Sequence, residues 1–325
     1  MSQNVALGVP SSGSPAPAAG PAAQVPVPSR RTFKASPYLL LIPAVVILLL
    51  GLGYPIYWQI LNSMRQYGLE QQFGQPAVFV GLDNFVRVFT APDLWAVVVR
   101  SIAFCLVNAF LTVALGLGFA LLMRAVNKVV RIILQVSLLL AWAMPMVAAV
   151  TVFKWLFDFR TGVVNWFLTS IGLDFFQGFS WLAKPWSFFF VATVIIVWMS
   201  VPFVALSIYA GLTSVPDEVL EAARIDGAGP WNITMRILLP MIRPVISIVL
   251  LLQIIWDLRV FAQINLLQQS GAPVSETNLL GNFIYQMGIG KGDFGGAAAV
   301  ALFVLALTVV LSWPYVRSLM KEDAL

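Results

Sequence analysis

The strongest constraint on this chain is a series of long stretches without a charged residue. A helix needs about 20 apolar residues to cross the ~30 Å hydrocarbon layer of a membrane. Such stretches lie between Lys34 and Arg65, Arg100 and Arg124, Arg131 and Lys154, Lys184 and Asp217, and Asp293 and Arg317. A further apolar stretch is interrupted by Asp257 and Arg259. The sequence therefore predicts an all-α membrane protein with six transmembrane helices, near residues 37–63, 98–123, 130–156, 185–213, 241–267 and 295–318.

Composition excludes most soluble and catalytic functions. Charged residues make up only 10% of the chain, whereas soluble domains carry about 25%. There is no His, which removes imidazole bases and His metal ligands. The single Cys, Cys105, lies in an apolar run and has no partner for an intrachain disulfide. The basic residues are scattered singly, so no nucleic-acid partner is expected.

The two ends of the chain are expected on the cytoplasmic side. Residues 1–29 are rich in Pro, Ala, Ser and Gly and carry no charge, so we expect 1–33 to be a disordered cytoplasmic tail and 34–325 to be the membrane domain. Six spans place both termini on one side, and the positive-inside rule selects which side that is. The basic residues on the side of the termini are Arg30, Arg31, Lys34, Arg124, Lys128, Arg131, Arg224, Arg236, Arg243, Arg317 and Lys321.

The segment between the fourth and fifth spans, residues 214–240, is too long and too regular for a simple turn. Ser214 and Asp217 have the spacing of a capping box, and Pro216 suits a first helical turn. Gly227 and the pair Gly229–Pro230 are expected to end this first helix. A second short helix from about Trp231 leads back to the membrane at Leu239–Pro240. This pattern predicts a helix–turn–helix along the cytoplasmic face, with small residues that suit docking into a partner.

This segment resembles the EAA loop of binding-protein-dependent ABC importer permeases. The resemblance rests on Glu221-Ala222-Ala223, then Gly227, then Ile237-x-Leu239-Pro240, with nine residues between the Gly and the Ile. The longer string EAARIDGA at 221–228 is similar to the carbohydrate-uptake branch, which includes the maltose-type and glycerol-phosphate-type importers. Further similarity lies in YPIYWQILNSM at 54–64, VGLDNFVRVF at 80–89 and WMSVPFVALSIYAGLTSVP at 198–216.

The resemblance implies a type I ABC importer permease fold with a cytoplasmic coupling helix over 217–228. The residues it assigns to ATPase coupling are Glu221, Ala222, Ala223, Asp226 and Gly227. Glu221 would pair with a basic ATPase residue, the two alanines would pack closely against that subunit, and Gly227 would make the turn. The implied partners are a second homologous permease, two ATPase subunits, an extracytoplasmic solute-binding (lipo)protein, a carbohydrate and membrane lipid. The implied location is the bacterial plasma membrane.

ATP is not expected on this chain. The stretch GIGKGDFGG at 288–296 is not a phosphate-binding loop, because Tyr285 stands where the pattern needs Gly, and Gly292 stands where it needs Ser or Thr. We therefore expect no cofactor on this chain, no catalytic or metal-binding residues, and ATP and Mg on separate ATPase subunits.

Ionisable residues inside a span mark functional sites by default. Asp257 and Arg259 stand two residues apart, so their side chains project about 200° apart on a helix. Two interpretations remain open: a structural pair bonded to neighbouring helices, or groups that hydrogen-bond substrate hydroxyls in a cavity shared with the second permease. Trp256 offers a flat apolar face to a sugar ring. Further pathway candidates are Trp198 and Ser200 in the fourth span, and Asn282, Tyr285 and Gln286 before the sixth.

Two other features bear on the spans. Pro202 removes a backbone hydrogen bond in the fourth span and is expected to kink or break that helix. Seven tryptophans near the span ends are expected to form an interfacial belt: Trp58, Trp95, Trp155, Trp166, Trp181, Trp186 and Trp313.

The sequence thus predicts the membrane-spanning half-pathway of an ATP-driven importer for a di- or oligosaccharide. A glycerol-phosphate-type ABC permease is the alternative within the family, and the lone Arg259 beside Asp257 favours a neutral substrate over an anion. An ion-coupled secondary transporter would need several intramembrane carboxylates or an internal repeat, and only Asp257 qualifies. A membrane-embedded enzyme is disfavoured by the absence of His and of clustered acids inside the spans.

Overall fold

The computed structural model describes residues 37–322. The chain divides between Leu52 and Gly53 into two compact units. In the first unit, α1 (Pro37–Leu48) passes into the π-helical turn η1 (Leu49–Gly53). The expected tail over residues 1–33 lies outside the described residues. The packing and the candidate site are described within the second unit, which begins at Gly53.

Long apolar helices dominate the described chain, as the charge-free stretches predict. Five helical segments are long and apolar enough to cross a membrane: Leu41–Ser63, Pro92–Ala125, Pro185–Thr213, Arg243–Gln268 and Phe294–Trp313. They contain α2 (Tyr54–Ser63), α5 (Pro92–Ala125), α9 (Pro185–Thr213), α13 (Arg243–Leu258), α14 (Ala262–Gln268) and most of α17 (Phe294–Glu322). The all-α membrane fold is confirmed, and the number of spans is five or six depending on how α6 and α7 are counted.

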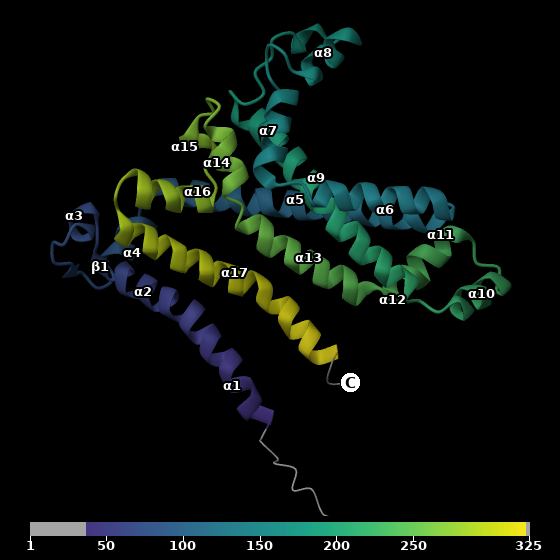
Figure 1. Ribbon diagram of the computed structural model, residues 1–325, viewed down its shortest axis with the longest axis horizontal. Coiled ribbons are helices and arrows are strands. Elements are labelled where there is room, and N and C mark those ends of the chain that lie inside the picture. The colour runs from purple at the N-terminus through teal and green to yellow at the C-terminus, as the bar shows by residue number, and fades with distance from the viewer. Residues whose placement is uncertain (1–36, 323–325) are drawn as a thin grey trace, which may run out of the picture. The chain divides into compact units, whose positions relative to one another are not determined.

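The third expected span is not one continuous helix. It consists of α6 (Lys128–Trp142) and α7 (Met146–Leu156), which meet at an angle of 98°. Pro145 stands immediately before α7. Proline has no backbone N–H, and it disfavours the helical conformation for the residue before it, here Met144. A continuous helix over 130–156 was therefore the wrong prediction, and Figure 1 shows α7 turning away from α6.

The long helices pack closely where small residues allow it. α5 packs most extensively on α9 and also contacts α13, while α2 lies beside α17 (Figure 1). Gly116 of α5 faces Val204 of α9, and a Cβ at this glycine would overlap the valine side chain. Small residues let helix backbones approach in this way in membranes. Pro202 does not break α9, which runs unbroken from Pro185 to Thr213.

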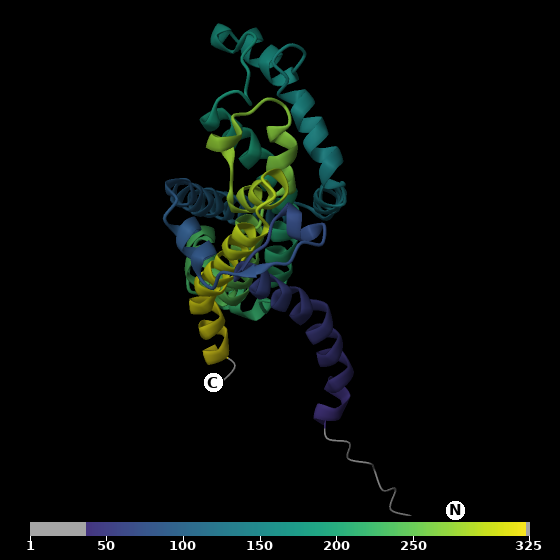
Figure 2. The same cartoon turned by 90° about the vertical axis from the view of Figure 1, so that its left-hand side faces the viewer.

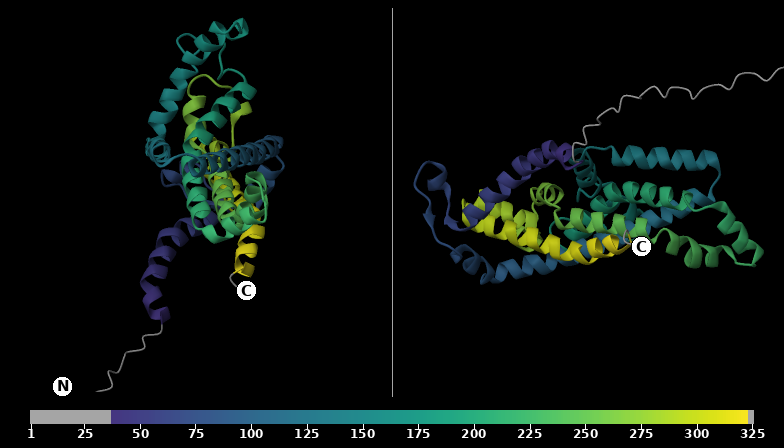
Figure 3. Two further views of the ribbon diagram at one scale, coloured as in Figure 1. Left: turned by 90° about the vertical axis from the view of Figure 1, so that its right-hand side faces the viewer. Right: turned by 90° about the horizontal axis from the view of Figure 1, so that it is seen from below.

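Short elements cap the two ends of the long helices. At one end lie the ribbon of β1 (Arg65–Gln66) and β2 (Val78–Phe79), paired as Arg65 with Phe79, and the helices α3 (Leu69–Gln72) and α4 (Asp83–Phe89). At the opposite end lies α10 (Asp217–Ile225), as Figure 3 shows. α7 and α8 (Val163–Ser170) extend beyond the long helices (Figure 2).

The remaining elements are single turns that join the helices. They are η2 (Asp174–Phe176), α11 (Pro230–Ile233), η3 (Thr234–Leu238), α12 (Leu239–Met241), α15 (Val274–Thr277), α16 (Leu280–Tyr285) and η4 (Gln286–Gly290).

Six of the seven belt tryptophans are exposed, and Trp181 is not. Its side chain is 6% exposed and its indole N–H donates a hydrogen bond to Asn165 Oδ1. Its ring stacks on Phe176 with ring centroids 5.3 Å apart. Trp181 therefore belongs to an aromatic core in the 157–184 segment, and its assignment to a membrane-interface belt was wrong.

Candidate functional site

The segment 214–240, predicted to dock a partner, contains the helix α10, which has one buried and one exposed face. Leu220 and Ala223 of α10 are buried in a hydrophobic cluster with Leu212 and Leu238. Glu218, Glu221, Ala222, Arg224 and Ile225 are exposed, and Ile225 is 85% exposed. Ala223 therefore packs on the chain's own core, and the face left open to a partner carries Glu221 and Ala222.

The two ends of α10 are fixed by different means. The predicted capping box is absent, because the Ser214 hydroxyl donates to Gly211 O and Pro216 occupies the N-cap position without a side-chain bond. At the other end, Gly227 has φ +76°. Its N–H donates to Arg224 O at 3.0 Å, and Ala228 N–H donates to Ala223 O at 2.9 Å. These paired bonds form a Schellman motif, which needs a residue in the left-handed region.

Charges on α10 match its dipole. Asp217 and Glu218 lie in the first turn and Arg224 lies in the last turn, where acids and bases respectively are stabilising. Glu221 makes no ion pair with the residues that the structure describes. Its carboxylate is exposed on the open face of α10 and available to a cation from another chain.

Asp257 and Arg259 lie on different sides of α13, as their spacing predicts. Asp257 is 3% exposed, and its Oδ1 accepts a hydrogen bond of 2.9 Å from Gln253 Nε2. Arg259 caps the C-terminal end of α13 and is exposed. The carboxylate therefore bonds within its own helix, while the guanidinium is accessible.

Three pathway candidates present accessible surface. Trp256 is 45% exposed and its ring lies 5.3 Å from that of Phe203, while Trp198 is 36% exposed and packs edge-on against Phe153 at 5.4 Å. Ser200 is partly exposed. Trp198 also lines an apolar groove of about 480 Å³ between α5, α6 and α9, together with Phe119, Leu138 and Pro202.

Of the three candidates before the sixth span, Asn282 and Tyr285 meet at Phe261, whereas Gln286 Oε1 accepts a hydrogen bond of 3.0 Å from Asn278 Nδ2. Asn282 is 1% exposed and donates from Nδ2 to Phe261 O at 3.3 Å. Tyr285 is 42% exposed, with its ring 5.2 Å from that of Phe261. Among the ring contacts and side-chain hydrogen bonds of residues 37–322, none joins this pair to Trp198 or Trp256. The candidates thus form separate clusters.

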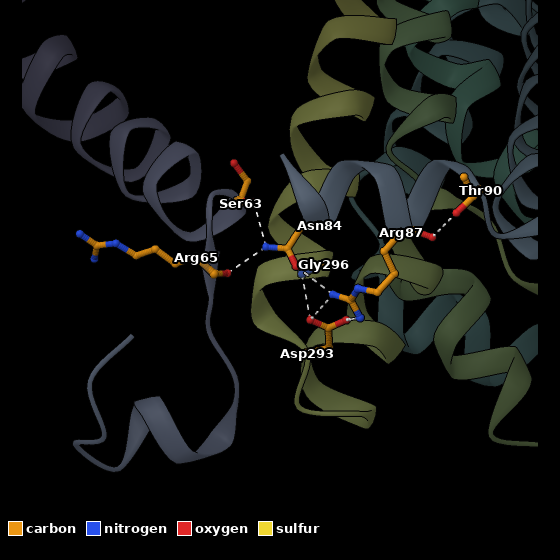
Figure 4. A network of polar contacts seen from close by, with 7 residues as sticks. All are labelled: Ser63, Arg65, Asn84, Arg87, Thr90, Asp293 and Gly296. Atoms are coloured by element: carbon orange, nitrogen blue, oxygen red, sulfur yellow. Dashed lines mark hydrogen bonds and ion pairs between the residues drawn. The ribbon is translucent and has the colours of Figure 1, made fainter. Parts of the chain in front are cut away.

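Sequence reasoning missed a polar network at the opposite end from α10 (Figure 4). Arg87 donates from both terminal nitrogens to Asp293, at 2.7 and 3.1 Å, and from Nη2 to Asn84 Oδ1 at 2.9 Å. Asn84 Nδ2 in turn donates to Ser63 O and Arg65 O at 2.9 and 2.8 Å. The hydrogen bond with Asp293 raises the pKa of Arg87 above its ordinary value, although burial opposes the shift.

This network joins three parts of the chain. It ties α4 to the end of α2 and to the start of α17, beside an open cleft of about 660 Å³ lined by Tyr67, Glu70 and Lys291 among others. The spacing of Asn84 and Arg87 was visible in the sequence as an i, i+3 pair on one helix face. The acid that pairs with Arg87, Asp293, stands 206 positions further on, and no local pattern connects the two.

A family comparison accounts for the fold. Residues 112–317 match the model of the binding-protein-dependent transport system inner membrane component. The chain belongs to this family. It is therefore a multi-pass transport permease of the inner membrane, which makes it a transport subunit and not an enzyme.

Named relatives cover nearly the whole permease. It is 41% identical over 288 residues to the diacetylchitobiose uptake system permease protein DasB of Streptomyces coelicolor, covering 89% of this chain and 88% of the relative. It is 32% identical to the sulfoquinovosyl glycerol transport system permease protein SmoG of Agrobacterium fabrum (88% and 90% covered). It is 30% identical to the trehalose/maltose transport system permease protein MalF of Thermococcus litoralis (84% and 90% covered).

Solved structures show the same fold. A chain of a bacterial ABC transporter that imports the acidic polysaccharide alginate superposes with a TM-score of 0.75 at 24% identity, covering 87% of this permease and 94% of that chain. The alginate transporter in complex with its pentasaccharide-bound periplasmic protein gives a TM-score of 0.73 at 23% identity, covering 86% and 91%. The type I ABC importer permease fold, which the resemblance of residues 214–240 to the EAA loop implies, is thereby confirmed.

Proposed function

We propose that this permease forms half of the translocation pathway of an ATP-driven importer for a di- or oligosaccharide, and that a solute-binding protein delivers the sugar. The observation that carries the proposal is the family match combined with relatives whose names specify sugar uptake. A second homologous permease supplies the other half of the pathway.

Energy enters through α10. Glu221 pairs with a basic residue of an ATPase subunit and Ala222 lets that subunit approach, while Gly227 and Asp226 hold the turn that orients the helix. The exposure of Glu221 and Ala222 supports these roles, and the burial of Ala223 assigns it to anchoring α10 on this chain. ATP and Mg reside on two partner ATPase subunits, and this chain binds no cofactor.

The orientation follows from the position of α10. Because the ATPase subunits are cytoplasmic, α10 and both termini lie on the cytoplasmic side. The cleft beside Arg87 and Asp293 then lies on the outer side, where the solute-binding protein arrives. The excess of basic residues on the side of the termini supports this orientation.

The accessible pathway candidates contact the sugar. Trp198, Trp256 and Tyr285 offer ring faces to the apolar C–H face of a sugar, and Ser200 and Arg259 offer donors to its hydroxyls. Asp257 and Asn282 are almost fully buried in the described conformation. They act from behind the pathway, by holding α13 and Phe261 in place.

An acidic saccharide is the second candidate substrate. The names of two similar proteins specify sulfoquinovosyl glycerol and alginate, both of which are anionic. Among the pathway candidates of this permease, Arg259 is the one cation, which favours a neutral sugar.

The proposal is tested in proteoliposomes that contain the permease with its partner subunits. We expect uptake of neutral oligosaccharides to require both ATP and the loaded solute-binding protein. ATP hydrolysis should be stimulated by binding protein loaded with a neutral disaccharide and not by binding protein offered glycerol phosphate. Uptake that continues without ATP or without the ATPase subunits would refute the importer mechanism.

A further inference from the structure

A cleft of about 480 Å³ lies between the first turns of α5 and the segment 274–291. Its lining carries charges of both signs, from Asp93, Arg100 and Lys291. Side chains of α5 and α16 add apolar surface to the same cleft. The three charged side chains therefore surround one shared volume.

The Arg100 guanidinium is held in place on one side only. Its Nη1 donates to Ser275 O at 3.3 Å and to Asn278 O at 3.1 Å. Asn278 is 5% exposed, and its own side chain is fixed by hydrogen bonds of 3.0 Å with Gln268 and Gln286. Nε and Nη2 of Arg100 make no hydrogen bond with the residues that the structure describes. The guanidinium is thus oriented by the protein, with donors left for a ligand.

The charges around the cleft balance without pairing. Among the described residues, Asp93, Arg100 and Lys291 form no ion pair with one another. Glu276 of α15 attracts Arg100 electrostatically but forms no ion pair with it. Two bases thus stand with two acids. A ligand that carries one negative and one positive group matches this balance better than a simple anion does.

The cleft lies where α5 leaves the hydrocarbon layer. α5 has 34 residues, and about 20 suffice to cross the layer, so its end turns reach the depth of the lipid headgroups. Arg124 in the last turn donates to Leu212 O, shortly before α10 in the chain, so the first turns lie at the opposite end. Asp93 and Arg100 stand in the first three turns. The cleft is therefore at headgroup depth in the leaflet opposite α10.

An apolar stripe continues inward from the cleft along the same face of α5. After Arg100, exposed and uncharged residues follow at intervals of three or four: Ala103, Val107, Phe110 and Ala114. These intervals keep the residues on one face of the helix. Val107 is 51% exposed and Phe110 is 71% exposed. In a membrane, this stripe is the surface that an acyl chain covers when its headgroup lies in the cleft.

We propose that the cleft binds the headgroup of one phospholipid of the phosphatidylethanolamine type, with an acyl chain along the stripe. Arg100 and Lys291 bind the phosphate, because guanidinium and ammonium groups donate to phosphate oxygens. Asp93 accepts from the primary amine of the lipid, which has three N–H donors like that of Lys. Basic pockets between membrane helices bind lipid headgroups. This lipid site needs neither sugar nor ATP, so it stands whether or not the proposed function holds.

The test uses the permease purified with its partner subunits and stripped of lipid in detergent. Native mass spectrometry counts the lipids retained after phosphatidylethanolamine or phosphatidylcholine is added. We expect the unmodified complex to retain one more phosphatidylethanolamine than phosphatidylcholine per permease, together with a higher midpoint of thermal unfolding. The two lipids share the phosphate, but the trimethylated amine of phosphatidylcholine has no N–H to donate to Asp93.

Matched variants locate the bound lipid. Arg100→Gln should lose the additional lipid, whereas Arg160→Gln, which removes an exposed cation outside the spans, should keep it. Asp93→Asn should retain the two lipids equally. Lys291→Gln changes an exposed side chain and should weaken retention while the hydrogen bonds of Arg100 stay intact.

The proposal is overturned if the unmodified complex retains both lipids equally, or retains neither because a second permease covers the stripe. It is equally overturned if Arg100→Gln retains as much phosphatidylethanolamine as Arg160→Gln does. A rise in the unfolding midpoint with inorganic phosphate as large as that with the lipid would show that the cleft selects a free anion, which also contradicts it. The measurements on the unmodified complex decide even if Arg100→Gln does not fold.

Discussion

Replacing Gly227 by Ala should disturb ATPase coupling, while the same replacement at Gly229 should not. Gly227 has φ +76°, and no heavy atom lies within 4 Å of a Cβ placed on it. The cost is therefore conformational and not steric. Placing an L-residue in the left-handed region costs about 1–2 kcal/mol, which corresponds to a roughly 5–30-fold change in a local equilibrium.

The conformational cost of Gly227→Ala strains the Schellman turn at the end of α10. The helix has nine residues and is anchored by Leu220 and Ala223, so relief of the strain should shift its last turn and the open face that carries Glu221. Gly229 has φ −69° and equally open surroundings. Alanine there fits the backbone, so Gly229→Ala avoids the cost of placing an L-residue in the left-handed region.

The assay measures sugar uptake and ATP hydrolysis together in proteoliposomes. We expect Gly227→Ala to lower uptake by up to the roughly 5–30-fold change in the turn equilibrium, with normal expression and normal binding of the solute-binding protein. Gly227→Asn should restore part of the loss, because Asn tolerates the left-handed region better than other residues. Equal uptake by the two alanine variants would refute the argument from φ.

Three further predictions concern single contacts. Glu221→Ala should abolish ATP-driven uptake with little change in substrate affinity, because it removes the carboxylate on the open face of α10; Asp174→Ala, which removes an exposed acid outside the spans, is the control, and normal uptake by Glu221→Ala would contradict the coupling role. Gly116→Ala should destabilise by about 1–3 kcal/mol in thermal unfolding, because its Cβ would overlap a valine of α9. Gly118→Ala has open space and should unfold like the unmodified protein; equal midpoints for the two variants would show that α5 and α9 can separate freely. Asn84→Ala leaves two backbone carbonyls without their donor and should cost about 1–3 kcal/mol, seen as faster hydrogen exchange in the 65–80 segment; unchanged exchange there would contradict this.

Local patterns in the sequence predicted the helices well. Charge-free stretches predicted the spans because a charge in hydrocarbon is costly wherever it stands in the chain. Gly227 predicted the end of α10 because only a residue tolerant of positive φ closes that turn. The sequence also predicted that Asp257 and Arg259 face different sides, since helical geometry alone separates residues two positions apart.

Other outcomes depended on contacts between distant segments. Ser214 and Asp217 have the spacing of a capping box, yet the Ser214 hydroxyl bonds back to Gly211. Trp181 resembles an interfacial residue in the sequence and becomes core because Asn165 and Phe176 surround it. Ala223 faces inward because a hydrophobic cluster with residues from α5, α9, α11 and α13 lies beneath α10.

The sequence by itself therefore determined the long apolar helices, the end of α10 at Gly227, and the family that the chain resembles. These properties follow from the cost of charge in lipid and from backbone preferences, both of which act on neighbours in the chain. Only the tertiary structure decided the 98° angle between α6 and α7 and the pairing of Arg87 with Asp293. The pairing joins residues far apart in sequence, and the angle sets the relative direction of two helices, so packing in three dimensions fixes both.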